Sequence, residues 1–306
     1  MSHIIVKKMI GNVHSYAGSE WYYDFKALPN LLQEAHVATF VAERSQILDA
    51  LVKNWSIETN SQWLVRLFFS VKMIFTASVM LKSAEYSESK NLRISVPYLN
   101  YYALLYSLRS MVMVLPEISW QQGKKTIINI GHKHTIDTAY DVLEKIDAAS
   151  AKNFKQVALS LKTLRELISY RAPSSAEGAM SFLKDIDIVQ HCRLFVEMAQ
   201  LMSELLEKAL LSSYNKEELL KFGLDNNILQ HAYRHKIDDV EIYDKEDAHR
   251  IKYFERKYPV LANIMHMMSE GHVEDAFGAW CSDNDDEDEQ ANFNPDAEWR
   301  VIFDVP

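Results

Sequence analysis

The stretch Ser61–Leu115 constrains the fold more than any other part of the chain. Apolar residues recur at three- and four-residue steps from about Trp63 to Ser87, and again from Pro97 to about Leu115. Both runs are too long for strands. Proline is favourable in the first turn of a helix, because it lacks only an N–H group that would be unpaired there. We therefore predict two long, adjacent and largely buried helices.

Two later runs, about Asn153–Arg171 and Asp185–Ser212, have apolar faces that match these helices. We predict that all four pack as one helical bundle over residues 61–212. The residues expected at its centre are Leu105, Leu108, Leu164, Leu201 and Leu205. Eight glycines and seven prolines are few for 306 residues, which favours a mainly α fold over a sheet with many turns.

Shorter elements flank the predicted bundle. Residues 1–60 form an N-terminal strand or loop and a helix that starts at Pro29, and residues 213–306 form a small helical region with an acidic tail. Further helices are expected at about 136–146, 225–235, 245–257, 259–269 and 273–280. His3–Ile10 and Trp299–Val305 are strand-like. We predict that Trp299–Val305 docks on the body of the protein, as a strand beside His3–Ile10.

The charge is concentrated at one end of the chain. Residues 282–306 carry nine acidic residues and one arginine, so nearly all of the net charge of −9 lies in this tail. The rest of the chain lacks the general basic surplus that is typical of nucleic-acid-binding proteins. A local basic region at 231–257 is balanced by its own acidic residues, and we predict that the acidic tail docks there.

The sequence predicts a soluble protein in the cytoplasm. Two cysteines far apart indicate no disulfide framework, and the N-terminus has no signal-peptide pattern. Trp63–Leu81 is the most membrane-like run, but Arg66 and Lys72 interrupt it. Each charge at the centre of a span costs about 2.5–3.5 kcal/mol, so we expect a buried helix and no membrane contact.

Motifs for common cofactors and metals are absent from the sequence. It has no Walker loop, no G-x-G-x-x-G turn and no H-E-x-x-H helix. Asp283–Glu289 has the composition of a calcium loop but lacks glycine at the sixth position. We therefore predict no cofactor and no metal site.

One segment resembles a known family. The turn Ala84-Glu85-Tyr86-Ser87 is followed by Val96-Pro97-Tyr98-Leu99-Asn100-Tyr101-Tyr102-Ala103-Leu104-Leu105-Tyr106-Ser107-Leu108. This pattern is similar to the second-helix region of YaaC-like proteins and, more loosely, of the HEPN superfamily. The resemblance implies a HEPN-like four-helix bundle, a homodimer, and a bacterial role in RNA-directed, toxin-like or antiviral defence.

HEPN ribonucleases resemble one another in an arginine that is followed four to six residues later by a histidine, near the junction of the last two helices. Arg171 lies at the corresponding junction here, but no histidine follows at that distance. The resemblance therefore implies a degenerate or non-standard site. If the protein is an enzyme, we expect a metal-independent ribonuclease.

The loop 117–135 supplies the other candidate site residues. RNA cleavage needs an acid or base of near-neutral pKa and a cation for the phosphate. On a strand, His132 and His134 would share one face and could act as acid and base. If RNA is cleaved, we predict that Arg171 and one of these histidines carry the reaction, with the helix junction and the loop meeting at one cleft. The neighbouring Lys124, Lys125 and Lys133 are the expected nucleic-acid-binding residues.

Two alternatives stay open at this point. Arg171 also fits a charge that extends from a helix C-terminus into water, and the histidine loop also fits an exposed surface. The competing function is a non-enzymatic, dimerising interaction or scaffold protein that its acidic tail regulates.

Overall fold

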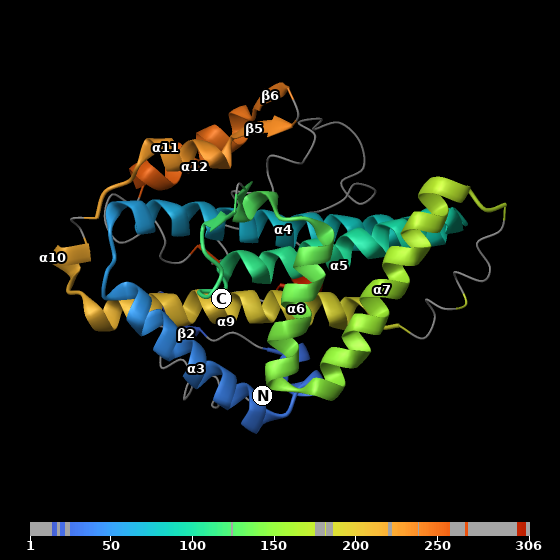
Figure 1. Ribbon diagram of the computed structural model, residues 1–306, viewed down its shortest axis with the longest axis horizontal. Coiled ribbons are helices and arrows are strands. Elements are labelled where there is room, and N and C mark those ends of the chain that lie inside the picture. Colours follow the sequence, from blue (N-terminus) through green and yellow to red (C-terminus); the bar gives the residue numbers. More distant parts are fainter. Residues whose placement is uncertain are drawn as a thin grey trace.

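The computed structural model describes residues 14–16, 19–21, 25–123, 125–174, 181, 186–219, 222–237, 239–257, 267–268 and 299–303. This part of the chain is mainly α, as predicted (Figure 1). Its helices are α2 (Ala27–Leu31), α3 (Glu34–Val52), α4 (Ile57–Ser89), α5 (Val96–Val114), α6 (His132–Ile146), α7 (Ala148–Arg171), α9 (Ile188–Ser213), α10 (Lys216–Leu219), α11 (Asn226–Leu229) and α12 (Lys245–Lys257).

Short antiparallel hairpins and 3₁₀ turns complete the described chain. The hairpins pair β1 (His14–Tyr16) with β2 (Ser19–Trp21), β3 (Gln121–Gln122) with β4 (Lys125–Thr126), and β5 (Arg234–Ile237) with β6 (Val240–Tyr243). The 3₁₀ turns are η1 (Arg93–Ser95), η2 (Ile127–Asn129), η3 (Gln230–Ala232) and η5 (Trp299–Val301).

Helix α5 lies at the centre of the molecule. It packs against α4, α9, α6 and α7, and Figure 1 shows α6 and α7 crossing beside the long α4, α5 and α9. Four of the five leucines predicted at the centre are buried: Leu105, Leu108, Leu201 and Leu205. Leu164 is half-buried, because the second half of α7 projects beyond the core that its first half covers. The four-helix HEPN-like arrangement and the domain boundaries stay predictions.

Arg66 of α4 is a buried charge whose hydrogen-bond partners lie at the end of α5. Its guanidinium donates from Nε to the carbonyl oxygen of Met113 at 2.5 Å and from Nη2 to that of Leu115 at 2.6 Å. These carbonyls lie at the C-terminus of α5, where a cation is favourable. The guanidinium also lies 4.1 Å from the ring centroid of Trp63, and burial lowers the pKa of Arg66 to about 9.

By length and composition α4 could cross a membrane. However, 72% of its most apolar window is buried inside the protein, as in the core helix of a soluble protein. The buried contacts of Arg66 are with α5 rather than with lipid. The structure is therefore compatible with the predicted soluble protein.

The predicted β pairing of the two termini is wrong for the C-terminal partner. Trp299–Val301 form the 3₁₀ turn η5, and Trp299, Ile302 and Phe303 are all buried. Three of these side chains can face the same core only if the chain curls, whereas a strand would turn alternate residues outward. His3–Ile10 and the acidic run 283–289 lie outside the described residues, so docking of the acidic run stays a prediction.

The region after α10 also differs from the predicted helices. Residues 225–235 form α11, η3 and the start of β5 instead of one helix, whereas α12 confirms the helix predicted at 245–257. The helices predicted at 259–269 and 273–280 fall almost entirely outside the described residues. The hairpin β5–β6 was missed because each strand has four residues and most of its side chains are exposed, which leaves little apolar alternation.

Candidate functional site

Polar and aromatic side chains from three helices meet beside α5. Tyr101, Tyr102 and Arg109 come from α5, His132 is the first residue of α6, and Arg165 comes from α7. We call these five residues the His132 site. They come together because the chain returns to α5 twice, first through α6 and then through α7 (Figure 1).

His132 is held by tyrosines. The Tyr101 hydroxyl lies 2.8 Å from His132 Nδ1, within hydrogen-bond distance. The imidazole centroid lies 5.8 Å from that of Tyr101 and 6.0 Å from that of Tyr102, and its plane is nearly perpendicular to the Tyr102 ring. The residue is half-buried. These contacts hold the imidazole ring in one orientation at the surface of the protein.

The surroundings of His132 are positively charged. Burial lowers the pKa of His132, and Arg109, Arg165 and Lys162 lower it further. A ring with a lowered pKa is mainly neutral at pH 7, because the ordinary value is about 6.5. The site therefore combines fixed cations with an imidazole that is mainly uncharged at pH 7.

The two arginines are oriented by neighbouring oxygen atoms. Arg165 Nη2 donates to the Tyr102 hydroxyl at 3.0 Å, and its guanidinium carbon lies 5.7 Å from the Tyr102 ring centroid. Arg109 Nη2 donates to the carbonyl oxygen of Ile128 at 2.7 Å. The Nε atom of each arginine is enclosed and has no hydrogen-bond partner. Both guanidiniums are half-buried, and their charge favours an anion that enters the site.

The start of α6 adds to the positive potential. Its N-cap, Gly131, has no side chain, so the first N–H groups of the helix receive no side-chain cap. The helix dipole places partial positive charge at this end, beside His132. Together with the arginines, this end of α6 favours a phosphate or carboxylate.

Aromatic side chains extend the site along α5. Tyr98, Tyr102 and Tyr106 follow one another at four-residue spacing, with centroid distances of 4.8 Å and 6.1 Å. Tyr98 is 38% exposed. Such a row, beside arginines, gives flat surfaces on which the bases of a nucleic acid can stack.

The structure separates the two predicted histidines. They lie in the first turn of α6 and not on a strand, so the condition under which they would share a face is not met. Residues two apart on a helix point to different sides, because each residue turns by about 100°. His132 enters the site, whereas His134 is exposed.

The predicted lysines do not contact His132 through any described hydrogen bond or ion pair. Lys133 pairs with Asp137 on the surface of α6, at 2.5 Å. Lys125 is exposed on β4, and Lys124 lies outside the described residues. Their role in binding nucleic acid stays a prediction.

Arg171 is the last residue of α7 and is exposed. Ala172 follows with φ 40°, a left-handed conformation that ends the helix. Arg165 lies six residues earlier, about 9 Å along the helix axis. Within the described part of the chain Arg171 makes no hydrogen bond to either histidine, and its catalytic pairing stays a prediction.

Sequence reasoning missed Tyr101, Arg109 and Arg165. The sequence did offer a signal for Arg109: it is a charged residue within the apolar run of α5, and a buried charge needs a partner or a function. Arg165 had no such sign, since α7 carries many charges. Among the described residues, no group of three or more His, Cys, Asp or Glu side chains is arranged to hold a metal ion.

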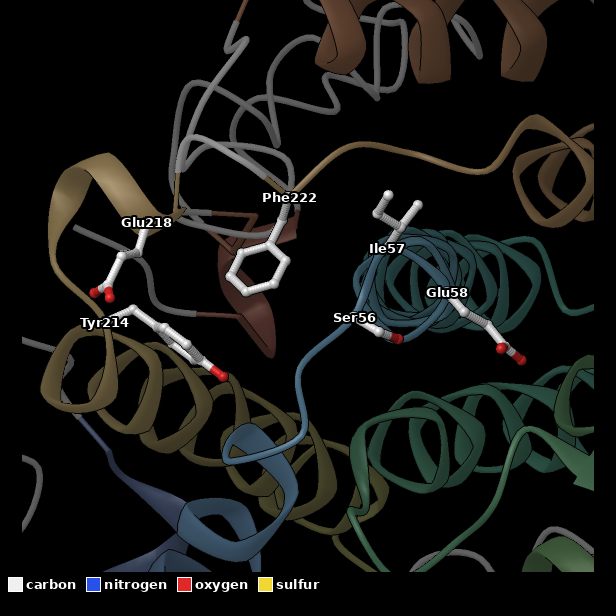
Figure 2. Close-up of a pocket in the computed structure, with 6 residues that line it drawn as sticks. All are labelled: Ser56, Ile57, Glu58, Tyr214, Glu218 and Phe222. Carbon is white, nitrogen blue, oxygen red and sulfur yellow. The ribbon is translucent and has the colours of Figure 1, made fainter.

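A separate cavity of about 650 Å³ lies where α4 begins, beside α10. Ser56, Ile57, Glu58, Tyr214, Glu218 and Phe222 line it. Figure 2 shows the rings of Tyr214 and Phe222 side by side opposite Ile57, with the carboxylate of Glu58 turned away from them. The described lining residues include no lysine or arginine, so this cavity does not suit a phosphate.

Comparison with known proteins gives no match: no family model, no curated protein and no solved structure is similar to this chain.

Proposed function

We propose that this is a cytoplasmic, bacterial HEPN-like protein that acts on RNA without a metal ion. The His132 site carries the proposal. It places a neutral imidazole among cations, beside a row of tyrosines. Cleavage of RNA by its own 2′-hydroxyl requires proton transfer and stabilisation of charge on the phosphate, and these side chains offer both.

In this proposal each side chain has one task. Arg165 and Arg109 bind a phosphate oxygen, His132 exchanges a proton with a reacting oxygen, and the tyrosines hold the neighbouring bases. Arg165 thus has the phosphate-binding role that the sequence predicted for Arg171. A toxin-like or antiviral role would follow from cleavage of cellular or phage RNA, and the pairing of two copies would follow from the family resemblance.

The test is cleavage of a fluorescent single-stranded RNA by the purified full chain in the presence of EDTA. His132→Ala and Arg165→Ala should each lower the rate by about 10²–10⁴, as expected for loss of proton transfer or of charge stabilisation. The matched controls are His134→Ala and Arg171→Ala, which replace the exposed counterparts on the same two helices and should leave the rate nearly unchanged.

Other results would contradict parts of the proposal. Loss of activity in Arg171→Ala with retention in Arg165→Ala would restore the arginine that the sequence predicted. Failure of the wild type either to cleave or to bind RNA would remove the proposed activity altogether.

An interaction or scaffold protein is the second candidate function, and the hairpin β5–β6 favours it. Cross-strand pairs place Ile237, Val240 and Ile242 on one face of the hairpin, and these residues are 61%, 62% and 45% exposed. Exposed apolar side chains in a group are typical of surfaces that bind other proteins. A wild-type chain that does not bind RNA in the test above would favour this function.

A further inference from the structure

We infer that Tyr101 is a positioning residue that holds His132 in the tautomer with its proton on Nε2. His132 then presents a hydrogen-bond donor to an anionic oxygen. This inference rests on the proposed function for its chemical meaning, but the tautomer itself can be measured without any RNA.

The geometry around the Tyr101 hydroxyl decides the direction of the hydrogen bond. The residue is 2% exposed, and within the described part of the chain its hydroxyl has one hydrogen-bond partner, His132 Nδ1. If Nδ1 were the donor, the phenol proton would be buried without an acceptor, which costs free energy. The hydroxyl therefore donates, and the proton of the neutral imidazole must lie on Nε2.

Tyr101 keeps its proton over the physiological range. Burial raises the pKa of Tyr101 to about 12; Arg165 opposes this rise, whereas Tyr102 and Glu166 add to it. A phenol with this pKa remains a donor at any pH at which the protein would work. Nδ1 consequently stays occupied as an acceptor in the resting, neutral form of His132.

Nε2 is the ring atom that a ligand can reach. Among the described residues it makes no hydrogen bond, and it is not one of their enclosed, unpaired polar atoms. The charged groups that act on His132 are Arg109 from α5 and Lys162 and Arg165 from α7. Lys162 also pairs with Glu166, at 3.6 Å, and on α6 itself Lys133 pairs with Asp137.

The tautomer determines which proton transfer His132 can carry out in the proposed reaction. Neutral His132 has no lone pair on Nε2, so it cannot remove a proton there. Protonated His132 can pass its Nε2 proton to the leaving 5′-oxygen as the bond from phosphorus to that oxygen breaks. The 2′-oxygen bonds to phosphorus in the same reaction, and water takes the proton of the 2′-hydroxyl. The ring is then neutral with its proton on Nδ1, the tautomer that Tyr101 disfavours, and it returns to the Nε2–H form when Nε2 takes a proton from water and Nδ1 releases one. His132 is therefore the acid of the reaction, and cleavage should fall as the pH rises through the pKa of His132.

The experiment is nitrogen NMR of the full chain labelled with ¹⁵N-histidine, with the His132 signals assigned by their loss in His132→Gln. The wild type should show the Nε2–H pattern at high pH. Tyr101→Phe removes the donor and should give a mixture of tautomers. It should also raise the pKa of His132 towards its ordinary value, because the lost hydrogen bond stabilised the neutral ring.

Tyr140→Phe is the control, because it also removes a phenol hydroxyl that donates a hydrogen bond, but this hydroxyl is exposed and donates to Glu144 instead of His132. It should leave the tautomer and pKa of His132 unchanged. A wild-type ring in the Nδ1–H form, or an unchanged tautomer in a folded Tyr101→Phe variant, would overturn the inference.

The experiments distinguish a failure of the positioning role of Tyr101 from a failure of the proposed RNA cleavage. An Nε2–H ring in a protein that does not cleave RNA would leave the positioning role of Tyr101 intact and remove the proposed activity. Cleavage that rises with pH through the pKa of His132 would show a base at this position and would overturn the acid role, although RNA would still be the substrate.

Discussion

At the scale of single residues, Glu197 shows how one buried side chain organises two elements. It lies on α9, and its carboxylate accepts hydrogen bonds from the backbone N–H groups of Lys26, Ala27 and Leu28 at 2.8–2.9 Å. Helix α2 has no side-chain cap of its own. Glu197 therefore caps α2 from a distance of about 170 residues in the sequence. Burial raises the pKa of Glu197, and these hydrogen bonds oppose the rise.

Glu197→Ala should lower the free energy of unfolding by about 3 kcal/mol or more, because it leaves several N–H groups buried without acceptors. Glu197→Gln keeps one acceptor oxygen and should cost less. Denaturant unfolding measures both, and Glu34→Ala, at an exposed position in the first turn of α3, is the control. Equal stability of Glu197→Ala and wild type would show that water replaces the cap.

At the scale of elements, α12 is tied to α4 by an ion pair. Lys72 donates to the carboxylate of Asp247, which is 5% exposed. Burial raises the pKa of Asp247, and Lys72 opposes this rise. Near this pair the His235 ring of β5 packs on Phe69, with centroids 6.3 Å apart. The ion pair and the ring contact therefore both join the region of α12 and the hairpin to α4.

Asp247→Ala should loosen this region locally. We expect a loss of about 1–3 kcal/mol, less than for a fully buried pair, because Lys72 keeps 24% of its side chain exposed. Hydrogen exchange should accelerate in α12 and leave α5 unchanged. Asp137→Ala, which breaks the surface pair with Lys133, should not alter exchange in α12. Uniform acceleration over the whole chain would contradict a local role.

At the scale of the whole molecule, the C-terminal segment, residues 299–303, packs against α4 and α9 and completes the core. Phe303 packs on Phe75 of α4 with centroids 6.5 Å apart and on Trp299 at 5.8 Å. Arg193 of α9 donates to the carbonyl oxygen of Val301. The segment thus bridges α4 and α9, although Val301 lies 108 residues after Arg193 in the sequence.

Phe303→Ala should lower the free energy of unfolding by about 3–5 kcal/mol through the lost burial and the cavity that remains. Thermal unfolding measures this loss, and Val301→Ala, at a half-buried position, should cost clearly less. A melting temperature of Phe303→Ala equal to that of the wild type would show that the C-terminal segment is not part of the core.

The sequence alone determined the long helices and most of the predicted core. The periodicity of apolar residues located the long helices, and Leu105, Leu108, Leu201 and Leu205 are buried as that pattern requires. It also indicated that the C-terminal aromatic segment would be buried. These features follow from local spacing, because a helix places residues three and four apart on one face whatever surrounds it.

The tertiary structure decided the partners of each charge and the composition of the site. Tyr101, His132 and Arg165 lie on three helices, so no local pattern could bring them together. The same holds for Glu197, whose N–H partners belong to α2. The 3₁₀ turn at Trp299 replaced a strand because the available core lies on one side of the segment. Burial against distant elements determines these features, and it depends on how the chain returns to α5 and α9.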